Sequence, residues 1–168
     1  MAKAKERILI LDKERIGYKL QRMAYQVWEH NSKAESVTLV GVEGSGLAVA
    51  KNLAKRIEEI SPLKVQVLSL ALNKRKPLSK EIKLSEDLSG KSVVLVDDVA
   101  NSGKTLLYAL RPLLDHELKS IQVAVLVDRK HKSFPVSPDI VGHTIATTLQ
   151  EHIEVETNGE SIEAAYLQ

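Results

Sequence analysis

The stretch from Ser92 to Leu107 constrains the fold of this chain more than any other part of the sequence. Residues 93–96 are all apolar, as in a strand buried on both faces, and Asp97 and Asp98 follow where that strand should end. Small and hydroxylated residues come next, and then an apolar run at helical spacing. In an open α/β sheet, ligands bind beyond the carboxyl ends of the strands, where a helix N-terminus offers free N–H donors to an anion. The stretch therefore predicts a sugar-phosphate site, with carboxylates suited to hydroxyl groups or a hard cation.

Two other interpretations explain this stretch less well. Gly103-Lys104-Thr105 is similar to the end of a Walker nucleotide loop, but that motif requires a Gly where Asp98 stands. A charged side chain at that position would obstruct the phosphate cradle, so the nucleotide-triphosphatase interpretation is rejected. An ordinary strand-turn-helix with an Asp as helix cap accounts for one carboxylate but not for two.

The apolar strand, the Asp97-Asp98 pair and the segment Ser102-Gly103-Lys104-Thr105 together resemble the phosphoribosyl pyrophosphate (PRPP) signature of type I phosphoribosyltransferases. The resemblance implies an α/β fold with a central, mainly parallel sheet flanked by helices and a small hood. It implies that Asp97 and Asp98 are the catalytic residues, facing the ribose hydroxyls and holding Mg²⁺ through water. The residues that it places at the 5-phosphate are Ala100, Asn101, Ser102, Gly103, Lys104 and Thr105.

Length and composition restrict the remaining possibilities. The 168 residues fit one domain spanning 1–168, and the absence of cysteine excludes a disulfide framework, a thiolate nucleophile and a zinc-thiolate site. The charged start leads into only four apolar residues, 8–11, too few for a signal peptide core or a membrane span. We therefore expect a cytoplasmic protein. The net charge of +2 hides an acidic end, residues 151–168, which carries five Glu and no Lys or Arg.

Apolar periodicity predicts alternating strands and helices along the chain. Asp12 caps a predicted helix over residues 13–30, and strands are expected at 36–40, 64–72 and 121–127. A second helix is expected at 47–60, and the helix that opens the phosphate site should run from 106 to 114. Residues 151–157 alternate like a strand before an Asn158-Gly159 turn. The alternation favours a parallel sheet.

Gly and Ser residues between the first strand and the second helix form a loop whose N–H groups can approach an oxyanion. In the resembled family this loop contacts pyrophosphate, which assigns that role to Val42, Glu43, Gly44, Ser45 and Gly46. Close members carry Arg where Ser45 stands and often a basic residue where Glu43 stands. A basic loop at residues 73–90 corresponds to the family's mobile loop. We expect Lys74 or Arg75 to supply the missing positive charge.

Leu-Val-Asp-Arg-x-His followed by Pro-Asp-x-Val-Gly narrows the resemblance to the bacterial pyrimidine-operon attenuation regulators that are also uracil phosphoribosyltransferases. The match spans nearly the whole chain. It implies a base pocket bordered by residues 128–141, with Asp128, Arg129, Ile140 and Val141 as base-binding residues. It also implies that the N-terminal and C-terminal segments form the hood.

The expected activity is transfer of the phosphoribosyl group of PRPP to a nucleobase, uracil, with release of pyrophosphate and with Mg²⁺ as cofactor. The expected assembly is a homodimer or higher homo-oligomer. An alternative is an RNA-binding regulator with an mRNA leader as partner; known regulators differ from this chain at Gln21, Tyr25, Lys132 and Ser137. A second alternative, motivated by Glu43 and Ser45, is a non-catalytic sensor of PRPP or nucleotides.

Overall fold

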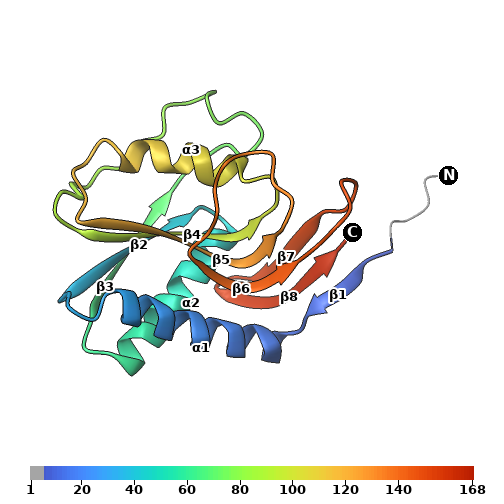
Figure 1. Ribbon diagram of the computed structural model, residues 1–168, viewed down its shortest axis with the longest axis horizontal. Helices are drawn as coiled ribbons and strands as arrows, with labels where there is room; N and C mark the ends of the chain where they lie inside the picture. The colour runs from blue at the N-terminus through green and yellow to red at the C-terminus, as the bar shows by residue number, and fades with distance from the viewer. Residues whose placement is uncertain (1–5) are drawn as a thin grey trace.

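The computed structural model describes residues 6–168, so the first five residues of the predicted domain lie outside the described residues. The larger of its two sheets has five parallel strands in the order β3-β2-β4-β5-β6 (Figure 1). These strands are β2 (Ser36–Val42), β3 (Lys64–Leu70), β4 (Ser92–Ala100), β5 (Ser120–Arg129) and β6 (Ile140–Ile145). The predicted α/β class with a central parallel sheet is confirmed.

Helices cover both faces of this sheet. Helices α1 (Lys13–His30) and α2 (Ser45–Ile60) pack on one face, and α3 (Lys104–Leu113) packs on the other, as Figure 1 shows. The predicted bounds of α1 are confirmed, with Asp12 Oδ1 accepting a hydrogen bond from Arg15 N at 2.8 Å. Two hydrophobic clusters result, one beneath α1 and α2 and one beneath α3.

The smaller sheet, called the hood below, is antiparallel and has the order β1-β8-β7. It consists of β1 (Ile8–Leu11), β7 (Ile153–Asn158) and β8 (Ser161–Leu167), so strands from the two ends of the chain lie side by side. β7 and β8 are joined by a turn at Gly159, whose φ of 61° suits a residue without a Cβ atom. The inward-facing residues of the hood, including Ile153, Val155 and Ala165, belong to the hydrophobic cluster beneath α1 and α2.

The register of the parallel strands brings several chain segments to one edge of the large sheet. Ala100 at the end of β4 pairs with Asp128, and Arg129 at the end of β5 pairs with Ile145. β4 extends to Ala100, although the apolar run alone predicted an end at Val96, because Asp97, Val99 and Ala100 still pair with β5. The two aspartates therefore lie within the strand rather than beyond it.

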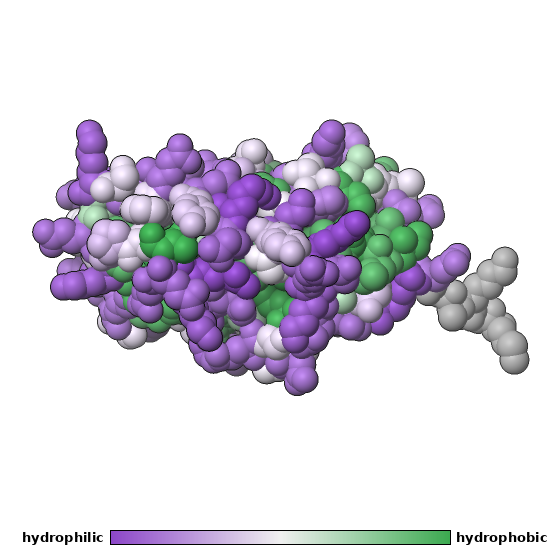
Figure 2. All heavy atoms as spheres, turned by 90° about the horizontal axis from the view of Figure 1, so that it is seen from below, coloured by the Kyte–Doolittle hydropathy of each residue, from purple (hydrophilic) through white to green (hydrophobic). Residues whose placement is uncertain are grey.

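One face of the molecule is mostly polar over α1 and α2, while hydrophobic residues gather at the end that carries the hood (Figure 2). Ile8 and Leu9 of β1 are 55% and 53% exposed. Within residues 6–168, no helix combines the length and apolar character needed to cross a membrane.

Candidate active site

A cavity of about 580 Å³ opens at the carboxyl edge of the large sheet and is closed on one side by the hood. Four segments far apart in the chain line it: the start of α2, the basic loop (residues 73–90), the end of β4 with the loop into α3, and β7. The lining residues are Ser45, Lys74, Arg75, Asp98, Val99, Ala100, Asn101, Ser102, Gly103, Thr105, Leu106, His152, Ile153, Glu154 and Val155. The structure thus brings most of the residues predicted for the phosphate and pyrophosphate together around one space.

The loop into α3 has the geometry of an anion site. Gly103 is the N-terminal cap of α3 with a φ of 83°, and the Ser102 hydroxyl accepts a hydrogen bond from Lys104 N at 3.2 Å. The Ser102 carbonyl in turn accepts hydrogen bonds from Ser133 N and Phe134 N, each at 3.0 Å. A helix N-terminus held in this way presents N–H donors and a partial positive charge to the cavity.

Asp97 and Asp98 lie on different sides of β4 because successive strand side chains alternate. Asp98 lines the cavity, whereas Asp97 is fully buried and does not line it. Asp97 Oδ1 accepts a hydrogen bond from Asp98 N at 2.8 Å, and its Oδ2 is buried without a hydrogen bond among the described residues. Burial and the charge of Asp98 raise the pKa of Asp97 well above its usual value, although Lys74 opposes this shift.

Lys74 of the basic loop reaches across the cavity to this acidic pair. Its Nζ lies 3.4 Å from Asp97 Oδ1 and 3.6 Å from Asp98 Oδ1. Burial lowers the pKa of Lys74, but the charges of Asp97 and Asp98 more than offset this and raise it. Lys74 is therefore a protonated cation at neutral pH, beside the carboxylates expected to face ribose.

The predicted pyrophosphate loop is only partly directed at the cavity. Of its five residues, Ser45 alone lines the cavity, as the first residue of α2 after Gly44, whose φ is 93°. The predicted helix start at residue 47 was two residues late. Val42 and Gly46 are buried, and Glu43 is exposed. A Cβ added to Gly46 would lie 2.7 Å from Asp97 Oδ1, so a residue without a side chain allows α2 to approach the acidic pair.

The predicted base-binding residues are divided between the two ends of their strands. Asp128 and Arg129 lie at the carboxyl edge, near the cavity but outside its lining. Ile140 and Val141 lie at the start of β6, opposite Ala124 and Val125, and Ile140 is fully buried in the core. The register places Ile140 and Val141 level with Val96 and Asp97, two strands away on the far side of β5, and neither residue lines the cavity.

Asp128 and Arg129 are also engaged in local contacts. The Lys132 ammonium lies 2.7 Å from Asp128 Oδ1, as an ion pair rather than an aligned hydrogen bond, and donates to the Arg129 carbonyl at 3.0 Å. Arg129 Nη1 donates to the carbonyl of Glu151 at 3.0 Å. These contacts fix the loop after β5 against the segment that leads into β7.

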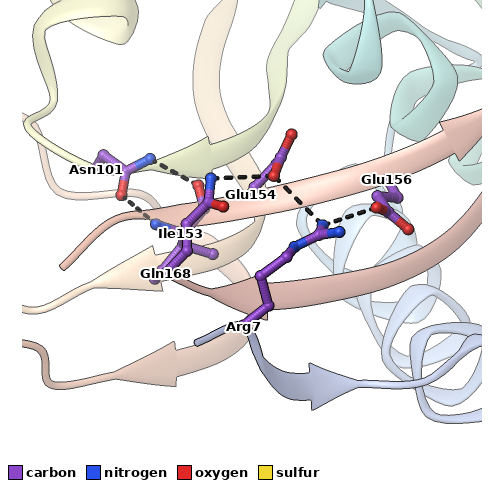
Figure 3. Close-up of polar contacts among 6 residues, drawn as sticks. All are labelled: Arg7, Asn101, Ile153, Glu154, Glu156 and Gln168. Carbon is purple, nitrogen blue, oxygen red and sulfur yellow. Dashed lines mark hydrogen bonds and ion pairs between the residues drawn. The ribbon is translucent and has the colours of Figure 1, made fainter. Parts of the chain in front are cut away.

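The hood supplies cavity residues that the sequence did not indicate as functional. His152, Ile153, Glu154 and Val155 line the cavity opposite the phosphate loop. Asn101 joins the two sides: its Nδ2 donates to the Ile153 carbonyl, and its Oδ1 accepts from Ile153 N, both at 3.2 Å (Figure 3). Strand alternation at 151–157 was the available signal, but it did not reveal which element the strand would face.

Comparison with known proteins agrees with this geometry. Residues 9–158 match the family model described as "Phosphoribosyl transferase domain". The chain is 35% identical over 163 residues to "Bifunctional protein PyrR" of Bacillus cereus and to that of Bacillus thuringiensis, covering 90% of this chain and 91% of each relative.

Solved structures share the fold. A hypoxanthine-guanine phosphoribosyltransferase from Bacillus anthracis has a TM-score of 0.75 at 20% identity, covering 94% of this chain and 96% of that one. The hypoxanthine phosphoribosyltransferase of Trypanosoma cruzi in complex with the product IMP has a TM-score of 0.73 at 16% identity, covering 87% and 79%. With the family match and the relatives at 35% identity, the chain belongs to the phosphoribosyltransferase family.

Proposed function

We propose that this chain transfers the phosphoribosyl group of PRPP to a nucleobase, with uracil as the preferred base, and releases pyrophosphate. The observation that carries the proposal is the single cavity of about 580 Å³ shared by the phosphate loop, Asp98, the basic loop and the hood. Its volume suits a nucleotide-sized ligand. In this proposal residues 1–168 act as one phosphoribosyltransferase domain.

The 5-phosphate binds at residues 100–105. Backbone N–H groups at the start of α3 and the hydroxyls of Ser102 and Thr105 face this anion, and the helix dipole adds to the attraction. The Asn101 side chain is directed to Ile153 in the free protein, so Asn101 contributes to the phosphate cradle through its backbone.

The ribose and magnesium lie beside Asp98. Among the described residues, no three His, Asp or Glu side chains are grouped closely enough to hold a metal by themselves. The pair nevertheless fits Mg²⁺, because it already holds a cation, Lys74, and because Mg²⁺ commonly takes one or two carboxylates and fills its shell with water and substrate oxygens. In this proposal Asp98 faces the ribose and the metal. The buried Asp97 carboxylate orients Asp98 by accepting a hydrogen bond from the backbone N–H of Asp98. The metal would neutralise charge on the pyrophosphate.

The leaving pyrophosphate is held by Lys74, Arg75 and the start of α2 at Ser45. Lys74 and Arg75 line the cavity, which supports their role as replacements for the family's Arg at position 45. Charge-assisted hydrogen bonds of this kind contribute about 1.5–3 kcal/mol. Only the start of the basic loop lines the cavity, since most of residues 77–82 lie against α3; closure of the loop over bound PRPP would exclude water and so protect PRPP from hydrolysis.

The base binds between the phosphate loop and β7. Ile153 presents a backbone N–H and carbonyl there, and His152 lies next to it in the cavity lining. A planar base needs a wall and a hydrogen-bonding edge, and β7 offers both. Asp128 and Arg129 support this wall from the end of β5 through the Arg129 contact to Glu151.

Measuring pyrophosphate release with magnesium-PRPP and uracil, hypoxanthine, guanine or xanthine in turn tests this proposal. We expect turnover, fastest with uracil, and a loss of at least about 100-fold in Asp98→Asn, because the residue facing the developing positive charge of the ribose ring loses its own charge. Faster turnover with a purine would refute the uracil assignment. PRPP binding without pyrophosphate release for any of the four bases would instead identify the chain as a sensor.

A second function, regulation through an mRNA leader, is motivated by the relatives' name "Bifunctional protein PyrR" and by a basic group on α1. Burial and the nearby charges of Lys19 and Arg15 lower the pKa of His143, which marks a positive surface there. Two contacts argue against RNA regulation, because they engage positions at which known regulators differ from this chain. Lys132 is paired with Asp128, and Gln21 Oε1 accepts a hydrogen bond from Arg56. Filter binding with a pyrimidine-operon leader RNA tests it: affinity that depends on sequence supports regulation, and affinity that depends only on salt refutes it.

We further propose a cytoplasmic homodimer or higher homo-oligomer. Exposed aromatic residues on α1, Tyr18 at 68% and Tyr25 at 50%, support an interface on that helix. Light scattering of the purified protein measures the mass directly, and a monomer of 18.6 kDa would contradict this assignment.

A further inference from the structure

The Asn101 side chain is paired with the backbone of one hood residue, although Asn101 belongs to the phosphate loop. Its carboxamide donates one hydrogen bond to Ile153 and accepts one from it, so both polar groups of the side chain are used. Figure 3 shows this reciprocal pair at the edge of β7. The residues are 52 positions apart in the chain, and both line the cavity.

The register of the hood explains why Ile153 is free to make this pair. His152 and Gln168 exchange backbone hydrogen bonds at 2.8 and 2.9 Å, so the polar groups of His152 point toward β8. In an antiparallel ladder the next residue points its N–H and carbonyl the opposite way. β7 is an edge strand of the hood, and Ile153 therefore directs both groups away from the sheet and into the cavity.

The strand behind this edge is fixed in place. Glu154 Oε2 accepts hydrogen bonds from Gln168 Nε2 at 3.0 Å and from Arg7 Nη2 at 3.4 Å, and Arg7 also binds Glu156 at 2.7 Å (Figure 3). The Ile153 side chain is 1% exposed within the core. The edge of β7 thus presents one hydrogen-bond donor and one acceptor, the backbone N–H and carbonyl of Ile153, from a strand that is held in place.

A carboxamide and the amide edge of a nucleobase have the same hydrogen-bonding pattern. Each places an N–H donor beside a carbonyl acceptor in one plane, and each can satisfy the N–H and carbonyl of a single backbone residue. An unpaired strand edge inside a cavity is a ready partner for such a group.

We infer that the Asn101 carboxamide occupies, in the free protein, the edge of β7 that the nucleobase takes when it binds. This inference rests on the proposed function and deepens it, since it adds that Asn101 holds the backbone of Ile153 until the base arrives. The base must displace Asn101 to reach that backbone. Asn101 is therefore a positioning residue that competes with the base, and it keeps Ile153 paired while the cavity is empty.

Two ligands separate base binding from phosphate binding. Ribose 5-phosphate reaches only the phosphate and ribose part of the site, whereas uridine 5′-monophosphate also places a base at β7. The ratio of their two Kd values, measured by calorimetry, reports the base alone. Asn101→Ala removes the competing amide and keeps the backbone of the phosphate loop, so we expect the ratio to shift about tenfold in favour of the monophosphate.

Asn52→Ala is the matched control. Asn52 Nδ2 donates to the Glu160 carbonyl at 2.7 Å, so Asn52 also connects another element, α2, to the hood, but outside the cavity. We expect its Kd ratio to equal that of the unchanged protein. If Asn101→Ala fails to fold, Asn101→Ser serves, because its hydroxyl is too short to reach both groups of Ile153.

The outcomes distinguish the two proposals. A ratio that is unchanged or shifted against the monophosphate in the Asn101 variant, or shifted equally in Asn52→Ala, overturns the inference while leaving the proposed function intact. Failure of the unchanged protein to bind either ligand overturns the proposed function, and the inference with it.

Discussion

Lys74 Nζ lies 3.4 Å from Asp97 Oδ1, so a lysine of the basic loop forms an ion pair with the buried carboxylate behind Asp98, which lines the cavity. The contact joins residues from two segments that the sequence suggested for different parts of the substrate. It places the positive charge of the loop over the cavity before any ligand is present.

Replacing Lys74 by Met should weaken PRPP binding by about 10- to 100-fold, because one charge-assisted bond to the pyrophosphate is lost. The measurement is the KM for PRPP in the pyrophosphate-release assay. Lys80→Met is the control, since Lys80 belongs to the same loop but lines a separate cavity against α3. Equal effects of the two substitutions on the KM for PRPP would contradict a specific contact by Lys74 and would show that PRPP binding depends only on the overall charge of the loop.

Replacing Asp97 by Asn should make stability less dependent on pH. Burial, with the charge of Asp98, raises the pKa of Asp97, so the folded protein binds that proton more tightly than the unfolded protein does. Stability then falls as pH rises from about 4, the ordinary aspartate pKa, through the raised pKa. At neutral pH the variant should therefore be more stable than the unchanged protein, and this gain should vanish toward pH 4. Urea denaturation across this range measures it; a difference independent of pH would contradict the burial argument.

Replacing Gly46 by Ala should disturb the acidic pair. The new Cβ would lie 2.7 Å from Asp97 Oδ1 and 3.2 Å from Asp97 Cα, and the backbone has little freedom to move away. We expect a loss of about 1–3 kcal/mol in the free energy of unfolding and weaker PRPP binding. Gly17→Ala is the control: its Cβ would meet only Arg56 Nη2 at 3.8 Å, and Ala favours the helix by up to about 1 kcal/mol. Thermal melts and PRPP titration of both variants decide the matter, and a Gly46→Ala protein that binds PRPP normally would contradict the assigned packing.

Replacing Lys132 by Met should destabilise the protein by about 3 kcal/mol, because it leaves the Asp128 carboxylate largely buried and unpaired. The side chains of Lys132 and Asp128 are 12% and 14% exposed. The double variant Asp128→Asn with Lys132→Met should recover most of this loss. Urea denaturation of the three variants tests the pairing. If Lys132→Met leaves stability unchanged and reduces RNA binding instead, Lys132 contacts RNA and does not stabilise the loop after β5.

Local pattern was sufficient for much of the fold. The helical period and the Asp12 cap predicted α1 over residues 13–30, because both signals depend on neighbours within a few positions. Alternating strands and helices predicted the parallel sheet, and the small residues after Asp98 predicted a helix N-terminus with the geometry of an anion site.

The arrangement of the site depended on contacts between distant residues. The pair Asp97 and Asp98 was visible in the sequence, but only strand register shows that Asp98 lines the cavity while Asp97 is buried beside Gly46. Ile140 and Val141 were assigned to the base from their position in a motif, but only the register shows that they start β6 level with Val96 and Asp97 and do not line the cavity.

The sequence by itself determined that this chain builds a strand-loop-helix suited to a phosphate within a parallel sheet, since short-range periodicity and capping are encoded by adjacent residues. The resemblance implied a hood from the two ends of the chain, but only the tertiary structure decided which residues of β7 line the cavity and that Asn101 reaches Ile153. That contact requires the two ends of the chain to pair as the hood, and pairing between segments so far apart leaves no periodic signal in either one.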